Sequence, residues 1–266
     1  MFDCHIHMMK EAQKDEFYRA AGEAGVSGGI LLSLPPASFD GNRYTNAERL
    51  DKVFKLAENR EGYFPFYWID PLEENARDQV DEAVSLGISG FKIICTEDYP
   101  DNEKAMKVYQ RVAYHDRPVL FHSGILWNRR DSSNFNRPAN FECLIGVPGL
   151  RFALAHVSWP WYDECLAVFG KFIYSNRHGN SNTMFIDLTP GTPEIYRKEV
   201  LTKLFCIGYD VEDFVIWGTD NHCEKYSVEW AKNWSRIDGG IFRELKLTEQ
   251  QVDKIFEKNL LKFIRG

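Results

Sequence analysis

The sequence predicts a single-domain α/β protein with a (β/α)8 TIM barrel, and three observations predict it. Eight short apolar runs recur along the 266 residues, and their starts lie roughly 30 residues apart, the size of one βα unit. Charge-dotted stretches of helical length separate the runs. No Pro/Gly/Ser-rich linker divides the chain, so we expect residues 1–266 to form one domain. An open doubly wound sheet would have the same periodicity, because a pattern of strands and helices does not report closure.

The expected strands are rich in Val, Ile, Leu and Phe, which is typical of parallel strands covered on both faces. They are the runs 1–7, 28–34, 63–69, 90–95, 118–122, 152–157, 184–188 and 214–218. The clearest expected helices are 11–24, 47–60, 73–86, 102–115, 162–172 and 193–204. A closing helix is expected from Thr248, because Thr248–Gln251 has the pattern of a capping box.

Composition and charge exclude several classes of protein. The net charge of -7 disfavours a nucleic-acid partner, because neutralising phosphates needs a basic face. No apolar run approaches the roughly 20 residues that a membrane span needs. The 6 cysteines are scattered and form no CxxC pair. The first strand begins next to Met1 and leaves no room for a secretory signal, so we expect reduced thiols and a cytoplasmic location.

The first expected strand ends in the sequence His5-Ile6-His7. Side chains alternate between the two faces of a strand, so both imidazoles should point the same way, with Asp3 below them. Two histidines at this spacing can hold one divalent ion.

Three further strand ends carry candidate ligands. His122 ends the fifth run, His156 ends the sixth, and Gly218-Thr219-Asp220 follows the eighth. The separation of 34 residues from His122 to His156 is one repeat, and the 64 residues from His156 to Asp220 are about two. Active sites of such barrels lie at the carboxyl ends of the strands. Imidazole nitrogens and a carboxylate suit zinc or a similar ion, so the pattern predicts one metal site.

These motifs resemble those of the amidohydrolase superfamily. The match is to its single-domain TIM-barrel branch of metal-dependent hydrolases and decarboxylases, the amidohydrolase 2 type. Gly90-Phe91-Lys92-Ile93 and the closing helix add softer support. The resemblance implies that His5, His7 and His122 hold the metal, with Asp220 as a further ligand or as the base on the bound water.

The resemblance gives His156 the role of stabilising charge or moving a proton, so Asp220 and His156 are the expected catalytic residues. The expected cofactor is a divalent metal, Zn2+ above all, as one ion with two as the alternative. A carbamylated Lys92 would bridge two ions, whereas an unmodified ammonium would face the substrate or Asp220. Family members often associate, which makes a homo-oligomer an expectation from resemblance.

Loops after the strands should shape a pocket for a small-molecule substrate. We expect Lys92, Trp127, Arg129 and Trp159 to bind it. The tryptophans would stack on a flat group, or merely cap the barrel, and Arg129 would grip a carboxylate, or be a solvated loop charge. Asp70 and Asp187 are candidates for orienting the imidazoles, and His222 is expected at the rim.

Three enzyme functions fit these residues. The first is a metal-dependent hydrolase that uses a metal-bound water to cleave a small cyclic ester, amide or related bond. The second is a nonoxidative decarboxylase or hydratase of an aromatic or dienoic acid. The third is a TatD-like nuclease, which the net charge and Lys92 both disfavour. The expectation is therefore a small-molecule substrate with no nucleic-acid or membrane partner.

Overall fold

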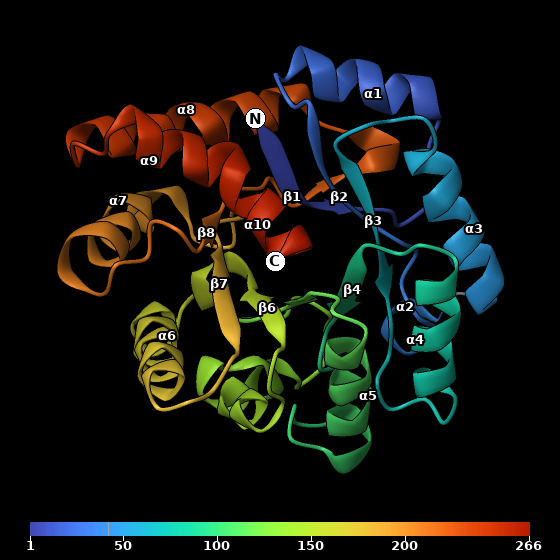
Figure 1. Cartoon of the computed structure of the whole chain (residues 1–266). Coiled ribbons are helices and arrows are strands. Elements are labelled where there is room, and N and C mark those ends of the chain that lie inside the picture. Colours follow the sequence, from blue (N-terminus) through green and yellow to red (C-terminus); the bar gives the residue numbers. More distant parts are fainter. Residues whose placement is uncertain (42) are drawn as a thin grey trace.

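Parallel strands surrounded by helices form a TIM barrel in this chain (Figure 1). A computed structural model describes residues 1–41 and 43–266. The strand order is β8-β7-β6-β5-β4-β3-β2-β1-β9, and every pair is parallel. The predicted fold class and the single-domain organisation are confirmed.

The elements follow one another as alternating strands and helices. The strands are β1 Phe2–His7, β2 Gly28–Leu32, β3 Tyr63–Trp68, β4 Gly90–Ile93, β5 Val119–Phe121, β6 Arg151–Leu154, β7 Thr183–Asp187, β8 Val215–Ile216 and β9 Asn221–His222. The α-helices are α1 Lys14–Glu23, α2 Ala37–Asp40, α3 Asn46–Ala57, α4 Ala76–Ser85, α5 Glu103–Tyr114, α6 Tyr162–Arg177, α7 Glu194–Thr202, α8 Val228–Glu244, α9 Glu249–Asp253 and α10 Asn259–Arg265. Within the described residues, no helix is both long and apolar enough to cross a bilayer.

The predicted eighth strand is divided in two, and this division closes the sheet. β8 ends at Ile216, and the chain regains strand geometry at β9, which pairs with β1 through Ile6↔Asn221 and His7↔His222. Between the two pieces, Cys4 N donates to Trp217 O at 2.9 Å. The connecting segment contains Asp220, whose φ of 56° turns the chain out of the extended conformation. The carboxyl ends of the first and last repeats therefore lie side by side.

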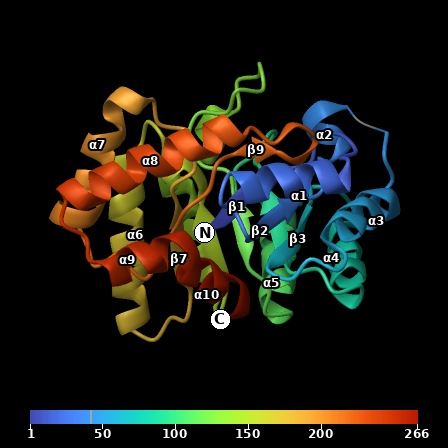
Figure 2. The ribbon, with the colours of Figure 1, turned by 90° about the horizontal axis from the view of Figure 1, so that it is seen from above.

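One end of the barrel is filled by the closing helix. Leu260 and Phe263 of α10 pack against inward-facing side chains of the strands, and both are buried. Their partners are Cys4, Ile30, Leu32, Phe66, Leu120, Ala153, Phe185 and Ile216. Figure 2 shows α10 at the opposite end of the barrel from β9. This end of the barrel is therefore filled by apolar side chains, and the open cavity lies at the carboxyl ends of the strands.

Most expected helices are present, with shifted ends. The capping box at the start of α9 is formed, since Thr248 Oγ1 accepts from Gln251 N and Thr248 N donates to Gln251 Oε1. The periodicity did not reveal α8, which begins after Ser227 and contains a Gly239-Gly240 pair. Glycine has low helix propensity. The helix is stabilised by its N-cap, because Ser227 Oγ accepts from Trp230 N.

A buried ion pair joins α7 and α8 to the barrel. Arg197 is 1% exposed and donates from Nε and Nη2 to the two carboxylate oxygens of Asp238, at 2.7 and 2.8 Å. Arg197 Nη2 also donates to Leu188 O at 2.6 Å, and Trp217 Nε1 donates to Asp238 Oδ2 at 3.0 Å. Two helices are thereby fixed to the segments that follow β7 and β8.

We expect Arg197→Met to destabilise the protein by about 3–5 kcal/mol, because it leaves the Asp238 carboxylate buried without its partner. Urea unfolding followed by circular dichroism measures this loss. Lys198→Met is the matched control, because the exposed pair Lys198–Glu244 joins the same two helices. The control should cost less than about 1 kcal/mol. Equal losses in the two variants would contradict the assigned role of Arg197.

Candidate metal centre and active site

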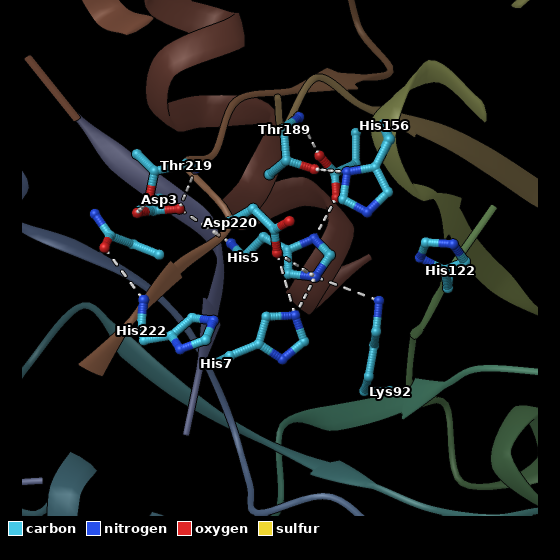
Figure 3. A network of polar contacts seen from close by, with 12 residues as sticks. Asp3, His5, His7, Lys92, His122, His156, Thr189, Thr219, Asp220 and His222 are labelled. Atoms are coloured by element: carbon cyan, nitrogen blue, oxygen red, sulfur yellow. Dashed lines mark hydrogen bonds and ion pairs between the residues drawn. The ribbon is translucent and has the colours of Figure 1, made fainter. Parts of the chain in front are cut away.

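Two imidazoles and one carboxylate converge at the carboxyl ends of β1 and β8 (Figure 3). The Nε2 atoms of His5 and His7 lie 3.1 Å apart. Asp220 Oδ1 lies 3.2 Å from His7 Nε2 and 3.7 Å from His5 Nε2. In the part of the chain that the structure describes, these three side chains form the group whose ligand atoms are close enough together to hold one ion.

This donor set fits a divalent cation. In a tetrahedral zinc site with bonds of about 2.0–2.2 Å, ligand atoms lie roughly 3.3–3.6 Å apart, close to the three separations above. Burial lowers the pKa of His7 and, together with Lys92, lowers that of His5 to about 3, so both rings are neutral at pH 7. Neutral imidazoles and an ionised carboxylate are the ligand forms that a metal requires. A cation between them would also relieve the repulsion of facing lone pairs.

Asp187, at the end of β7, sets the orientation of His5. The distance from His5 Nδ1 to Asp187 Oδ2 is 2.8 Å, and both side chains are fully buried. An ionised carboxylate can only accept, so Nδ1 carries the proton and Nε2 turns its lone pair to the centre. Although burial acts to raise it, the His5 imidazole holds the pKa of Asp187 below its usual value. The predicted orienting role of Asp187 agrees with this contact.

Asp3 fixes the segment that carries Asp220. Its Oδ1 accepts from Thr219 N at 2.9 Å and from His5 N at 3.1 Å. Its Oδ2 accepts from the hydroxyls of Thr219 and Tyr226 at 2.5 and 2.9 Å. Asp3 lies two residues before His5, and it is hydrogen-bonded to Thr219, the residue before Asp220. Its carboxylate therefore sets the separation between His5 and Asp220.

Asp220 is available as a proton acceptor. Its side chain is 34% exposed and faces the open cavity. Removal from bulk water acts to raise the pKa of Asp220, but the hydrogen bond with His7 and the neighbouring imidazoles hold it well below its usual range. The group is therefore a carboxylate at neutral pH, and it can bind a cation or take a proton from a bound water.

Lys92, on β4, reaches the centre from the opposite side of the barrel. Its Nζ lies 3.3 Å from His5 Nε2, and the side chain is fully buried. Burial lowers the pKa of Lys92 to about 8, against the opposing charges of Asp187 and Asp220. The amine places a positive charge beside the lone pair that would bind a metal.

His156 lies in a left-handed turn after β6, not on the strand where the sequence placed it. β6 ends at Leu154, and His156, Val157 and Ser158 have φ values of 63°, 46° and 58°. This turn directs the imidazole into the barrel, where Nδ1 lies 2.8 Å from Thr189 Oγ1. The loop after β7 approaches closely, because a Cβ on Gly191 would lie 2.6 Å from His156 Cβ.

His122 stands beside His156 and apart from the three converging ligand atoms. The two ring centroids are 5.1 Å apart. His122 Nε2 lies 3.3 Å from Ile125 O, and this contact makes Nε2 the donor. Burial lowers the pKa of His122 well below its usual value, with His156 and Lys92 adding to the effect. The neutral ring faces the cavity as a polar wall.

An open cavity of about 350 Å³ lies above these groups. Its polar lining includes His7, Lys92, His122, His156 and Asp220. Aromatic and aliphatic side chains form the remaining walls, and they are Met9, Phe39, Trp68, Ile94, Ile125, Leu126, Trp127, Trp159 and Pro190. A concave apolar pocket with a few convergent polar groups is the usual form of a small-molecule site.

The amidohydrolase family model matches residues 3–265. The chain belongs to the amidohydrolase family. No curated protein matches its sequence. The family assignment agrees with the resemblance found in the His-x-His and Gly-Thr-Asp motifs.

Solved structures share the fold of this amidohydrolase at low sequence identity. An uncharacterized TIM-barrel protein from Bordetella bronchiseptica is 16% identical with a TM-score of 0.73, and the match covers 100% of this chain and 99% of that chain. A probable 2-pyrone-4,6-dicarboxylic acid hydrolase from Acinetobacter baumannii, with citric acid bound, is 12% identical with a TM-score of 0.63 over 100% and 99% of the chains. A 5-carboxyvanillate decarboxylase from Novosphingobium aromaticivorans, with bound manganese, is 13% identical with a TM-score of 0.64 over 97% and 82%.

The structure brings most of the expected site residues of this amidohydrolase to one cavity. His5, His7 and Asp220 converge, Lys92 contacts His5, and His122 and His156 line the wall beyond them. The expected substrate-binding residues Trp127 and Trp159 also line the cavity, although Trp127 is 84% exposed.

Three other expected residues lie outside the group of converging ligand atoms. Arg129 is exposed on the loop after β5 and is not among the cavity-lining residues. Asp70 accepts from Leu72 N at 3.0 Å and thereby shapes a turn. His222 is 51% exposed and lies at the rim, where the sequence placed it. The carboxylate grip expected of Arg129 is therefore absent from the cavity lining described.

Several groups that shape the site had no recognised role in the sequence. Thr189 and Tyr226 act through contacts with His156 and Asp3, and Trp68 and Phe39 line the cavity. For Asp3 a signal was present, because alternation places it on the same face as the two histidines. For Thr189 and Tyr226 no local pattern was available, since their partners lie 33 and 223 residues away.

We expect Asp187→Asn to weaken zinc binding about 10- to 100-fold, because an amide no longer fixes the His5 tautomer and ring as a carboxylate does. Competition with a chromophoric chelator measures the affinity. Asp70→Asn is the control, since its amide oxygen can still accept from Leu72 N. Unchanged zinc affinity in Asp187→Asn, or an equal loss in the control, would contradict this role.

Proposed function

We propose that this amidohydrolase is a metal-dependent hydrolase that uses an activated water to cleave a cyclic ester, amide or related bond in a small molecule. One observation carries the proposal. His5 Nε2, His7 Nε2 and Asp220 Oδ1 converge at the base of an open cavity of about 350 Å³, which His7 and Asp220 line and His5 adjoins. That volume suits a compact substrate.

A single ion is proposed, with His5, His7 and Asp220 as ligands and His122 as a further candidate. A divalent ion there would supply Lewis acidity and would lower the pKa of bound water towards about 7. The set of two imidazole nitrogens and one carboxylate supports zinc. Lys92 is proposed as an unmodified amine. Metal analysis checks this point, because two equivalents of metal would instead favour a carbamylated, bridging Lys92.

The chain's own residues provide proton transfer. Asp220 is ionised and exposed to the cavity, so its carboxylate accepts the proton of the attacking water and passes it to the leaving group. Asp187 keeps the His5 ring in place while this happens. The contact between Thr219 and Asp3 keeps the segment that carries Asp220 in register with β1.

His156 is proposed to stabilise negative charge on the substrate oxygen. It lines the cavity opposite His7, and Thr189 fixes its Nδ1 edge. A hydrogen-bond donor held in position before the reaction stabilises developing charge without reorganisation. The buried Lys92 ammonium adds positive potential at the base of the cavity, beside His5.

We expect Asp220→Asn to lower kcat at least about 1000-fold, because it removes the proton acceptor and weakens a ligand. His7→Ala should lose both activity and tightly bound metal. Steady-state kinetics and metal analysis of the purified proteins measure these effects. His178→Ala, on an exposed loop, is the control. Full activity of metal-free protein would overturn the proposal.

A nonoxidative decarboxylase or hydratase of an aromatic or dienoic acid is the second candidate. The aromatic walls at Phe39, Trp68 and Trp159 and the buried Lys92 would suit a flat acid. Two parallel substrate screens separate the candidates, one of lactones and cyclic amides and one of aromatic carboxylic acids. We expect turnover in the first screen and no release of CO2 in the second. Release of CO2 with the lactones untouched would replace the hydrolase by the decarboxylase.

We propose a small molecule rather than a nucleic acid as the substrate. Among the described residues lining the cavity, Lys92 is the one ammonium or guanidinium, and it is fully buried. Phosphate backbones need exposed basic groups. Incubation of metal-loaded protein with single-stranded DNA tests the nuclease alternative.

A further inference from the structure

One side of the cavity is a continuous apolar wall. Trp68, Ile94 and Leu126 form a cluster of their own, separate from the main core. Met9 and Phe39 pack against it, so the wall is built from the end of β3 and from the segments that follow β1, β2, β4 and β5. The rings of Phe39 and Trp68 are 4.6 Å apart, and the Trp68 ring is 5.4 Å from that of His7. The wall therefore begins directly beside the metal ligands.

Polar groups form another part of the cavity lining. His122, His156 and Asp220 come from the segments after β5, β6 and β8, and all line the same cavity. A substrate with its reacting bond at Asp220 and His156 would place the rest of its body against the apolar wall. The cavity therefore fixes the orientation of a bound molecule.

Among the described residues that line the cavity, none carries a guanidinium, and the one ammonium is that of Lys92. Arg49 lies behind it, where Nε donates to Leu34 O at 3.1 Å and the guanidinium stacks on the Tyr67 ring at 4.6 Å. Arg130 donates to Ser38 O and lies 3.6 Å from Glu97. Both guanidinium groups are engaged outside the cavity lining, and Lys92 lies buried at the floor against His5. A carboxylate pressed against the wall would lose its hydration without compensation.

We propose that the cavity selects molecules that join one polar reacting group to an uncharged, flat apolar body, and that it rejects molecules with a second carboxylate on that body. The body lies on the wall formed by Met9, Phe39, Trp68, Ile94 and Leu126. The choice of reacting group rests on the proposed function, whereas the preference in binding does not require turnover.

Two matched ligands test this preference. Benzoate and isophthalate share one ring and differ by one carboxylate, and titration calorimetry with the zinc-loaded protein gives both dissociation constants. We expect benzoate to bind at least about 30-fold more tightly, because the second carboxylate of isophthalate meets apolar side chains. Equal affinities, tighter binding of isophthalate or no measurable binding of benzoate would overturn the proposal.

Leu126→Arg places a guanidinium on the wall and should reduce the preference for benzoate at least about tenfold. Leu86→Arg is the matched control, because Leu86 is 56% exposed after α4 and does not line the cavity. Its preference should equal that of the wild type. Phe39→Ala is the second variant in case Leu126→Arg does not fold. Phe39→Ala should weaken benzoate binding several-fold and leave isophthalate binding unchanged. An unchanged benzoate affinity would contradict the proposed contact between the ring and the wall.

The outcomes separate this proposal from the proposed function. If the protein prefers benzoate but hydrolyses no lactone or cyclic amide, the proposed hydrolase activity is overturned and the proposed binding preference stands. Efficient hydrolysis of a dicarboxylate, with its second carboxylate on the ring, would support the proposed hydrolase activity and overturn the proposed binding preference.

Discussion

The contact between Asp3 and Thr219 joins the first and last repeats of the barrel. One buried carboxylate accepts from two groups of Thr219, from His5 N and from Tyr226 Oη. Regular strand pairing is interrupted here, because β8 stops at Ile216 and β9 begins only at Asn221. The carboxylate replaces the missing ladder bonds. Together with the pairing of β1 and β9 and the bond from Cys4 N to Trp217 O, it holds the histidines of β1 close to Asp220, so the geometry of the candidate site depends on a residue that does not line the cavity.

The charges around this contact would favour a bound cation. Asp187 and Asp220 have lowered pKa values and are ionised, whereas burial keeps His5 and His7 neutral. The ammonium of Lys92 supplies one positive charge against these two negative ones, and the carboxylate of Asp3 is a third negative group, although burial raises its pKa to about 6. A divalent ion between the imidazoles would compensate the remaining negative charge in a region of low dielectric, where unpaired charges are costly. The same electrostatics that would be unfavourable in an ordinary core is thus suited to a metal site.

The sequence predicted what depends on local periodicity. Alternation along β1 placed Asp3, His5 and His7 on one face, and repeat spacing placed Asp220 at the same end of the barrel. It could not predict the turn at His156, because three consecutive non-glycine residues with positive φ have no sequence signature. It also left two roles open for Arg129, which lies exposed on the loop after β5. The path of that loop is set by Asn136, whose backbone and side chain bond to Ser123, Gly124 and Cys95, contacts that no periodic pattern reveals.

The two ends of the barrel differ in the side chains that fill them and in the interactions that hold these side chains in place. At the α10 end, Leu260 and Phe263 fill the interior with apolar side chains, which stabilises the fold. At the other end, buried carboxylates, imidazoles and an amine replace such packing, and they must be held by hydrogen bonds between repeats. The Arg197–Asp238 pair fixes α7 and α8 near that end and contacts Leu188 O, next to the Thr189 that positions His156. The buried ion pair outside the barrel therefore stabilises the end at which polar groups replace an apolar core. The loops at that end do not need to supply this stability, and they can instead contact the substrate.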